Sequence, residues 1–143
     1  MKVWTRIAFV LMFVPLVASA QFRDLDGAIS NLERGFGAGD VQAIVSGISD
    51  GDQVMLQFPG LVDQDGFFGR DQAAYLLDGL FNKVRPNGFE RISARKVSAE
   101  GQYHITARWT IKAGGQADTR DLYITLKQKG ERWSVVSVRS AGK

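Results

Sequence analysis

The sequence predicts an α+β fold in which helices pack on one face of a curved, mostly antiparallel sheet. In residues 89–139, apolar and polar side chains alternate with the two-residue period of β-strands, and glycine-containing turns interrupt them. In residues 22–85, apolar side chains mostly recur every three or four positions, as they do on one face of a helix. Helices and strands that are segregated along a chain are typical of the α+β class.

The first twenty residues have the pattern of a secretory signal peptide. Lys2 and Arg6 form a short basic start, an apolar run follows from Ile7 to Val17, and Ala18-Ser19-Ala20 supplies the small residues that a signal peptidase recognises. A membrane anchor is the alternative, but this run is much shorter than the roughly 20 residues that a spanning helix needs. We therefore expect a signal peptide over 1–20, one domain over 21–143, and a periplasmic or secreted protein with no membrane attachment after cleavage.

Removal of this segment changes the charge balance. The full chain of 143 residues carries a net charge of +3, and loss of Lys2 and Arg6 lowers it to +1. A nucleic-acid-binding protein usually concentrates basic residues on one face, so we expect no nucleic-acid partner. The chain contains no cysteine, which excludes disulfides, a thiol nucleophile and a thiolate metal site.

Three helices are predicted before the C-terminal strands. The first carries an apolar stripe and ends in a run of glycines, Gly35, Gly37 and Gly39. Asp40 is a suitable N-cap for a shorter second helix that carries apolar residues as far as Ile48. The third helix, over 69–85, carries a wide stripe that includes Leu80 and Phe81. Gln72 lies where a capping-box side chain reaches back to the cap.

One short strand over 53–58 separates the second helix from the third, and residues 61–68 form a loop or a second hairpin arm. Four strands then follow. The first of them, over 89–97, has a diluted alternation that favours an edge or strongly twisted strand. The other three cover 103–111, 121–128 and 131–139, and Gly114-Gly115 and Gly130 supply the turns between them.

The order of these elements resembles the NTF2-like superfamily, whose cone-shaped (cystatin-like) domain wraps a curved sheet around a long helix. Local features resemble the small exported DUF4783-type proteins found mainly in Bacteroidetes. They are Gly39-Asp40, the strand and stop over 53–60, Gln72-Ala73, Leu80-Phe81 and the closing hairpin over 126–133. Two departures are Gly69, where serine or threonine is the more usual cap, and the glycine-rich turn Gly114-Gly115. The resemblance implies an NTF2-like cone with three N-terminal helices, and it assigns no activity to named residues.

NTF2-like enzymes such as ketosteroid isomerase and scytalone dehydratase place aspartate, histidine and tyrosine inside the cone. The single histidine, His104, is five residues from Trp109, so the two point to opposite faces of a regular strand. Asp118 and Asp121 flank Arg120, and we expect these acids to be solvated. No nucleophile elbow, Walker loop or dinucleotide fingerprint is present. The sequence therefore predicts no catalytic residue, no metal site and no cofactor.

Aromatic side chains are the better candidates for a binding site. Tyr75 lies on the third predicted helix, and Trp109 and Trp133 share strand faces with Ile105 and Val135. These three residues either fill the core or line a pocket for an apolar ring-shaped ligand. The basic residues Arg91, Arg95, Lys96 and Arg108 either lie on solvated strand surface or form a strip on the outer sheet face for a protein partner. Many NTF2-like domains dimerise through that face, so a homodimer is a further expectation.

We therefore expect a non-catalytic module that binds a small apolar molecule or a protein. The alternative is a small-molecule isomerase, dehydratase or cyclase of the ketosteroid-isomerase kind, which would need a buried titratable group beside space for a substrate.

The signal-peptide hypothesis predicts the N-terminus of the exported protein. Because cleavage is expected after Ala20, mass spectrometry of the periplasmic fraction should find Gln21 as the first residue. Recovery of the intact 143-residue chain from that fraction would refute the hypothesis.

Overall fold

The computed structural model of the protein describes residues 25–97 and 101–141. The predicted signal peptide and the start of the first predicted helix, at Phe22, lie outside these ranges. Within them, no helix is long and apolar enough to cross a membrane. The elements in chain order are α2 (Leu25–Ala38), α3 (Val41–Val45), β1 (Gln53–Gln57), β2 (Gly66–Gly69), α4 (Arg70–Lys83), β3 (Arg85–Val97), β4 (Gln102–Ala113), β5 (Gln116–Lys129) and β6 (Arg132–Ser140).

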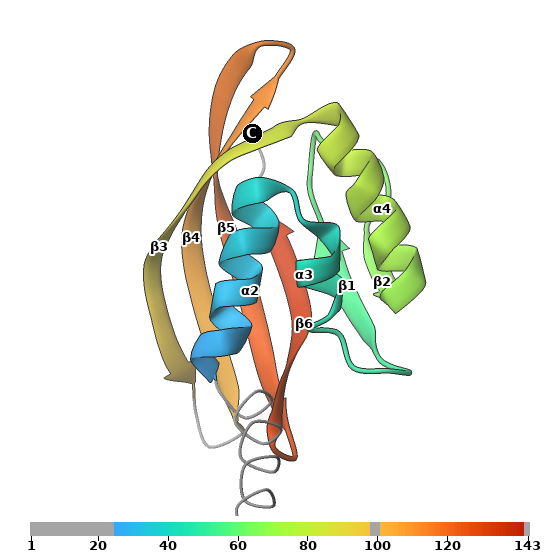
Figure 1. Ribbon diagram of the computed structural model, residues 1–143, viewed down its shortest axis with the longest axis vertical. Coiled ribbons are helices and arrows are strands. Elements are labelled where there is room, and N and C mark those ends of the chain that lie inside the picture. The colour runs from blue at the N-terminus through green and yellow to red at the C-terminus, as the bar shows by residue number, and fades with distance from the viewer. Residues whose placement is uncertain (1–24, 98–100, 142–143) are drawn as a thin grey trace, which may run out of the picture.

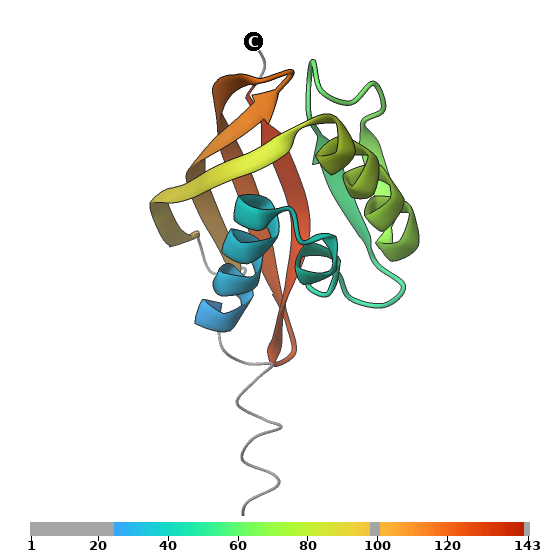
Figure 2. The same ribbon diagram turned by 45° about the horizontal axis from the view of Figure 1, so that its top comes forward.

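The six strands form one sheet in the order β2-β1-β6-β5-β4-β3. Neighbouring strands run antiparallel except β1 and β6, which run parallel. The helices α2, α3 and α4 lie on one face of this curved sheet (Figures 1 and 2). The predicted α+β class is confirmed. The three helices do not all precede the sheet in the chain, because α2 and α3 come before β1 whereas α4 follows β2.

Glycines in α2 serve close packing more than helix termination. The helix continues through Gly35 and Gly37 to Ala38, contrary to the prediction that all three glycines end it. Gly35 is buried, and a Cβ at this position would lie 2.3 Å from Cγ1 of Ile44. Gly39, with φ of 76°, takes the left-handed conformation that stops the helix. The absence of a side chain at Gly35 therefore lets α3 pack directly against α2.

Polar side chains fix the starts of the next two helices as predicted. A carboxylate oxygen of Asp40 accepts a hydrogen bond of 3.2 Å from the Ala43 amide and caps α3. Oε1 of Gln72 accepts one of 3.0 Å from the Gly69 amide, which is the half of a capping box that a glycine N-cap allows. The helix α3 ends at Val45, so Ile48 is buried in the turn that follows it.

The strand β3 lies at the edge of the sheet, as predicted, and contains two irregularities. Its pairing with β4 shifts between Pro86 and Gly88 and again between Arg91 and Ser93. The second shift separates arginines that regular alternation would place on one face. Arg91 turns toward α2 and lies 3.6 Å from Glu33, while Arg95 pairs with His104 on the opposite, outer face.

Of the two alternatives for the basic residues of this region, a single strip on the outer face does not form. On the outer face Arg108 lies 3.5 Å from a carboxylate oxygen of Glu90 and is partly neutralised by it. With Arg91 on the helix side of the sheet, four basic residues do not share one surface. The bulge in β3 reverses the side-chain alternation, which leaves the other alternative, solvated strand surface.

Four aromatic rings fill the centre of the cone: Phe36, Phe58, Phe81 and Trp109, here called the aromatic cluster. Ring centroids within it lie 5.7 to 6.5 Å apart, and the contacts between Trp109 and the rings of Phe36 and Phe81 are edge-on. Trp109 is fully buried, and its Nε1 donates a 2.8 Å hydrogen bond to the carbonyl oxygen of Phe36. The cluster packs α2, α4 and the residue that follows β1 against Trp109 on β4.

The position of Phe81 predicts a large loss of stability on truncation. Phe81→Ala should lower the free energy of unfolding by roughly 3 kcal/mol, at the low end of the range for a buried phenylalanine, because Phe81 is only partly buried. Tyr75→Ala is the matched control on the same helix, since Tyr75 is 84% exposed. It should change stability by no more than about 0.5 kcal/mol in urea denaturation. Equal effects of the two substitutions would mean that α4 presents a different face to the sheet.

Candidate functional site

A partly open cavity of about 570 Å³ lies between the first turns of α2, the segment from α3 to Ser49, and the start of β6. We call it the α2–β6 cavity. Its apolar wall is formed by Leu32, Ile44, Ile48, Trp133 and Val135. Small residues on the two helices, among them Ala28 and Ala43, leave the space between them open. A volume of this size lies within the range of small-molecule binding sites.

Trp133 forms the aromatic wall of the α2–β6 cavity. It is partly buried, at the start of β6, and its ring meets that of Tyr103 edge-on with centroids 6.1 Å apart. The Tyr103 contact holds the indole in place while leaving part of it open to the cavity. Trp133, a binding-site candidate from the sequence, thus lies beside a space large enough for a ligand.

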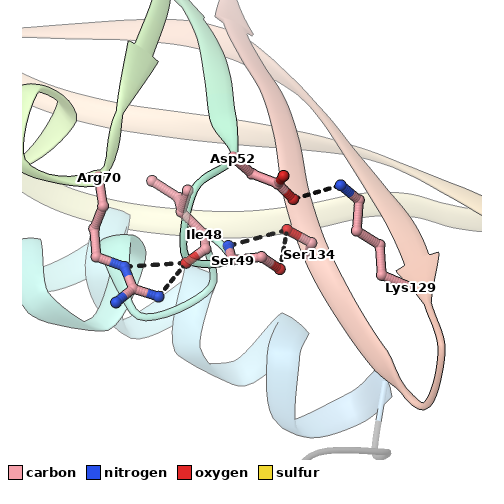
Figure 3. A network of polar contacts seen from close by, with 6 residues as sticks. All are labelled: Ile48, Ser49, Asp52, Arg70, Lys129 and Ser134. Carbon is pink, nitrogen blue, oxygen red and sulfur yellow. Dashed lines mark hydrogen bonds and ion pairs between the residues drawn. The ribbon is translucent and has the colours of Figure 1, made fainter.

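Hydrogen bonds hold the rim of this cavity to the sheet. The Val135 amide donates a 2.8 Å bond to the carbonyl oxygen of Gly47, and the Ser49 hydroxyl donates one of 3.1 Å to Oγ of Ser134. The Ser49 amide donates to the same oxygen at 3.3 Å, and Lys129 forms an ion pair with Asp52 nearby (Figure 3). The turn that follows α3 is therefore fixed to β6, and the cavity is preformed.

Two arginines contribute the charges of the cavity lining. Arg70, the first residue of α4, donates from Nε at 3.1 Å and from Nη2 to the carbonyl oxygen of Ile48 (Figure 3). Arg132 lies on the β6 side of the cavity. Among the described residues that line it, none is an aspartate, a glutamate or a histidine. Arg70 was not among the candidates from the sequence, because it contacts a carbonyl 22 positions away and belongs to no local motif.

The three predicted aromatic residues do not meet at one site. Trp109 lies in the aromatic cluster and lines neither the α2–β6 cavity nor the groove beside α4. Tyr75 lies on α4 at a wider groove of about 920 Å³, the α4 groove, which the loop before β2 also lines. Each residue thus has its own environment: a sealed core for Trp109, a cavity wall for Trp133 and an exposed rim for Tyr75.

His104 lies on the outer face of the sheet, as strand parity predicts. The pairing of β4 with β5 is continuous from His104 to Trp109, so no bulge disturbs the alternation between them. His104 is opposite Arg95 on one side and Thr125 on the other, and it lines neither the cavity nor the groove. Within the described ranges, no three histidine or acidic side chains gather closely enough to hold a metal ion.

Arg120, which lies between two acids that were expected to be solvated, is buried, while Asp118 and Asp121 remain partly exposed. Its Nη1 donates a 2.6 Å hydrogen bond to the carbonyl oxygen of Pro59, and its Nε lies 3.1 Å from Asp118. Asp118 and Arg120 share the inner face of β5, whereas Asp121 points to the outer face by alternation. The two aspartates therefore do not form a catalytic carboxylate pair, and Arg120 anchors the loop after β1 to the sheet.

No protein-family model matches the sequence, and no curated protein matches it. Solved structures share its fold. A DUF4783 family protein from Bacteroides ovatus is 18% identical, with a TM-score of 0.64 over 80% of this chain and 93% of that one.

Two further solved structures match over similar lengths. An NTF2-like protein of unknown function from Shewanella oneidensis is 16% identical, with a TM-score of 0.60 over 83% of this chain and 96% of that one. A protein from Catenulispora acidiphila with a ketosteroid isomerase-like fold, in complex with trimethylamine, is 10% identical. Its TM-score is 0.61 over 80% of this chain and 83% of that one. The chain has the NTF2-like fold, as its resemblance to that superfamily predicted.

Proposed function

We propose that the protein is an exported binding module that takes a small molecule with an apolar ring into the α2–β6 cavity, against Trp133. The observation that carries this proposal is a partly exposed tryptophan at the wall of a cavity of about 570 Å³. Aromatic faces and aliphatic walls contribute most of the binding energy in such sites, because they remove the ligand's apolar surface from water.

The construction of the cavity supports binding without rearrangement. Its turn is held to β6 by the Gly47–Val135 and Ser49–Ser134 hydrogen bonds, and the Trp133 ring rests on Tyr103. A site that is already ordered loses less conformational entropy when the ligand enters. The Catenulispora acidiphila protein, which holds trimethylamine, illustrates small-molecule binding on this fold.

The chemistry of the lining favours binding over catalysis. An isomerase or dehydratase needs an acid or base within hydrogen-bond reach of its substrate. The polar side chains among the described residues that line the α2–β6 cavity are arginines, serines and an asparagine, and the carboxylate beside it, that of Asp50, is paired with Arg70. Arginine remains protonated near neutral pH, so it can orient a ligand and is poorly suited to accept a proton.

Substitution of Trp133 tests this proposal. With neutral 2-naphthol as the probe in isothermal titration calorimetry, Trp133→Ala should weaken binding at least about tenfold, because the ligand loses its aromatic wall. Ala28→Leu, which fills the cavity from α2, should weaken it similarly without removing a core contact. Near-UV circular dichroism would verify that both variants remain folded.

His104→Ala and Tyr75→Ala are the controls, since neither residue lines the cavity. Both should bind the probe like the wild type. Binding that survives Trp133→Ala and Ala28→Leu but disappears in Tyr75→Ala would place the site in the α4 groove and overturn the proposal.

A further inference from the structure

The geometry points to a ligand that carries a carboxylate beside its apolar ring, with Arg70 as the residue that receives the carboxylate. This inference rests on the proposed function and names the class of ligand for the same cavity. It makes Arg70 the determinant of specificity, whereas Trp133 supplies affinity for the ring.

The described charged residues that line the α2–β6 cavity are both basic. Its described lining contains Arg70 and Arg132 and no acidic side chain. A partly enclosed cavity with low-dielectric walls strengthens the field of such charges compared with open water. The field of the lining residues favours an anion over a cation wherever the charge of Arg70 is not offset by its exposed partner Asp50.

Arg70 is held in position by a neutral partner. Two of its nitrogens, Nε and Nη2, donate to the carbonyl oxygen of Ile48, which belongs to the cavity wall (Figure 3). A carbonyl oxygen orients the guanidinium without cancelling its charge. The planar guanidinium presents further N–H donors in a fixed geometry that matches a carboxylate. Arg70 is thus oriented before any ligand arrives.

The carboxylate that Arg70 now contacts is weakly held. Its Nη1 lies 2.7 Å from a carboxylate oxygen of Asp50, whose side chain is 93% exposed and lies outside the cavity lining. Arg70 itself is 39% exposed. An ion pair between exposed groups contributes little in water. A ligand carboxylate, anchored by its ring on Trp133, can therefore replace Asp50, and Asp50 acts as a competitor for the same guanidinium.

Arg132 adds positive charge on the β6 side but is assigned a secondary role. It already has an interaction partner in the structure, and it is exposed. The α4 groove offers no equivalent site, because its charged lining residues are of both signs: Asp63, Asp71 and Lys83. The charge pattern therefore favours the α2–β6 cavity for an anionic ligand.

Three probes of matched size test the inference: 3-phenylpropionate, the neutral 3-phenylpropanamide and the cationic 3-phenylpropylamine. Isothermal titration calorimetry at low salt should show the carboxylate binding about tenfold more tightly than the amide, as expected for one charge-assisted contact. The amine should bind more weakly than the amide.

Two substitutions should change this preference in opposite directions. Arg70→Gln should lower the affinity for 3-phenylpropionate to about that for the amide, a loss of roughly tenfold, and leave amide binding unchanged. Asp50→Asn removes the competitor and should raise the affinity for the carboxylate by about two- to fivefold, again without effect on the amide. Arg95→Gln, which removes the same charge from the outer sheet face, should change neither.

The outcomes separate this inference from the proposed function. Equal binding of carboxylate and amide, both lost in Trp133→Ala, would overturn the role of Arg70 and leave the ring-binding proposal standing. Failure of all three probes and of 2-naphthol to bind would overturn both. If Arg70→Gln does not fold, Asp50→Asn decides, since Asp50 is exposed and its replacement should not affect stability. An unchanged affinity of that variant for 3-phenylpropionate would then overturn the inference.

Discussion

The hydrogen bond from Nε1 of Trp109 to the carbonyl oxygen of Phe36 is the contact on which the rest of this structure depends. It places the largest side chain of the core, fully buried, at the junction of α2 and β4 with its only polar hydrogen satisfied. Phe36, Phe58 and Phe81 then close around the indole. A buried polar group without a partner is costly, so the packing of α2 on the sheet and the satisfaction of Trp109 constrain each other.

The filling of the centre determines where a ligand can bind. Because the aromatic cluster occupies the middle of the cone, the α2–β6 cavity lies toward the start of α2 and the first residues of β6, where small side chains replace rings. The buried arginine on β5 has another role. Arg120 reaches the carbonyl oxygen of Pro59 and ties the loop after β1 to β5. Arg120 is therefore a structural arginine, whereas Arg70 combines a fixed orientation with access to a cavity.

The outer face of the sheet shows how a local irregularity changes surface chemistry. One extra residue in β3 sends Arg91 toward Glu33 on α2 and leaves Arg95 outside. With Arg108 beside Glu90, the outer face carries mixed charges instead of a basic strip. Such a surface is less suited to recognising an acidic partner than its arginine content suggests, and this shifts the functional interest to the α2–β6 cavity.

The sequence by itself determined the α+β class, the edge position of β3, the caps at Asp40 and Gln72, and the opposite faces of His104 and Trp109. All of these follow from contacts within a few residues or from the two-residue period of a strand. Only the tertiary structure decided that Trp109 is sealed while Trp133 borders a cavity. Strand alternation points both tryptophans to the inner face of the sheet, and the arrangement of α2 and α3 over that face determines what covers each of them. For the same reason the roles of Arg70 and Arg120 could not be predicted from the sequence, because these side chains bind backbone carbonyls 22 and 61 positions away. Periodicity shows which way a side chain points along its own element, but the group that it meets there is set by the packing of distant segments.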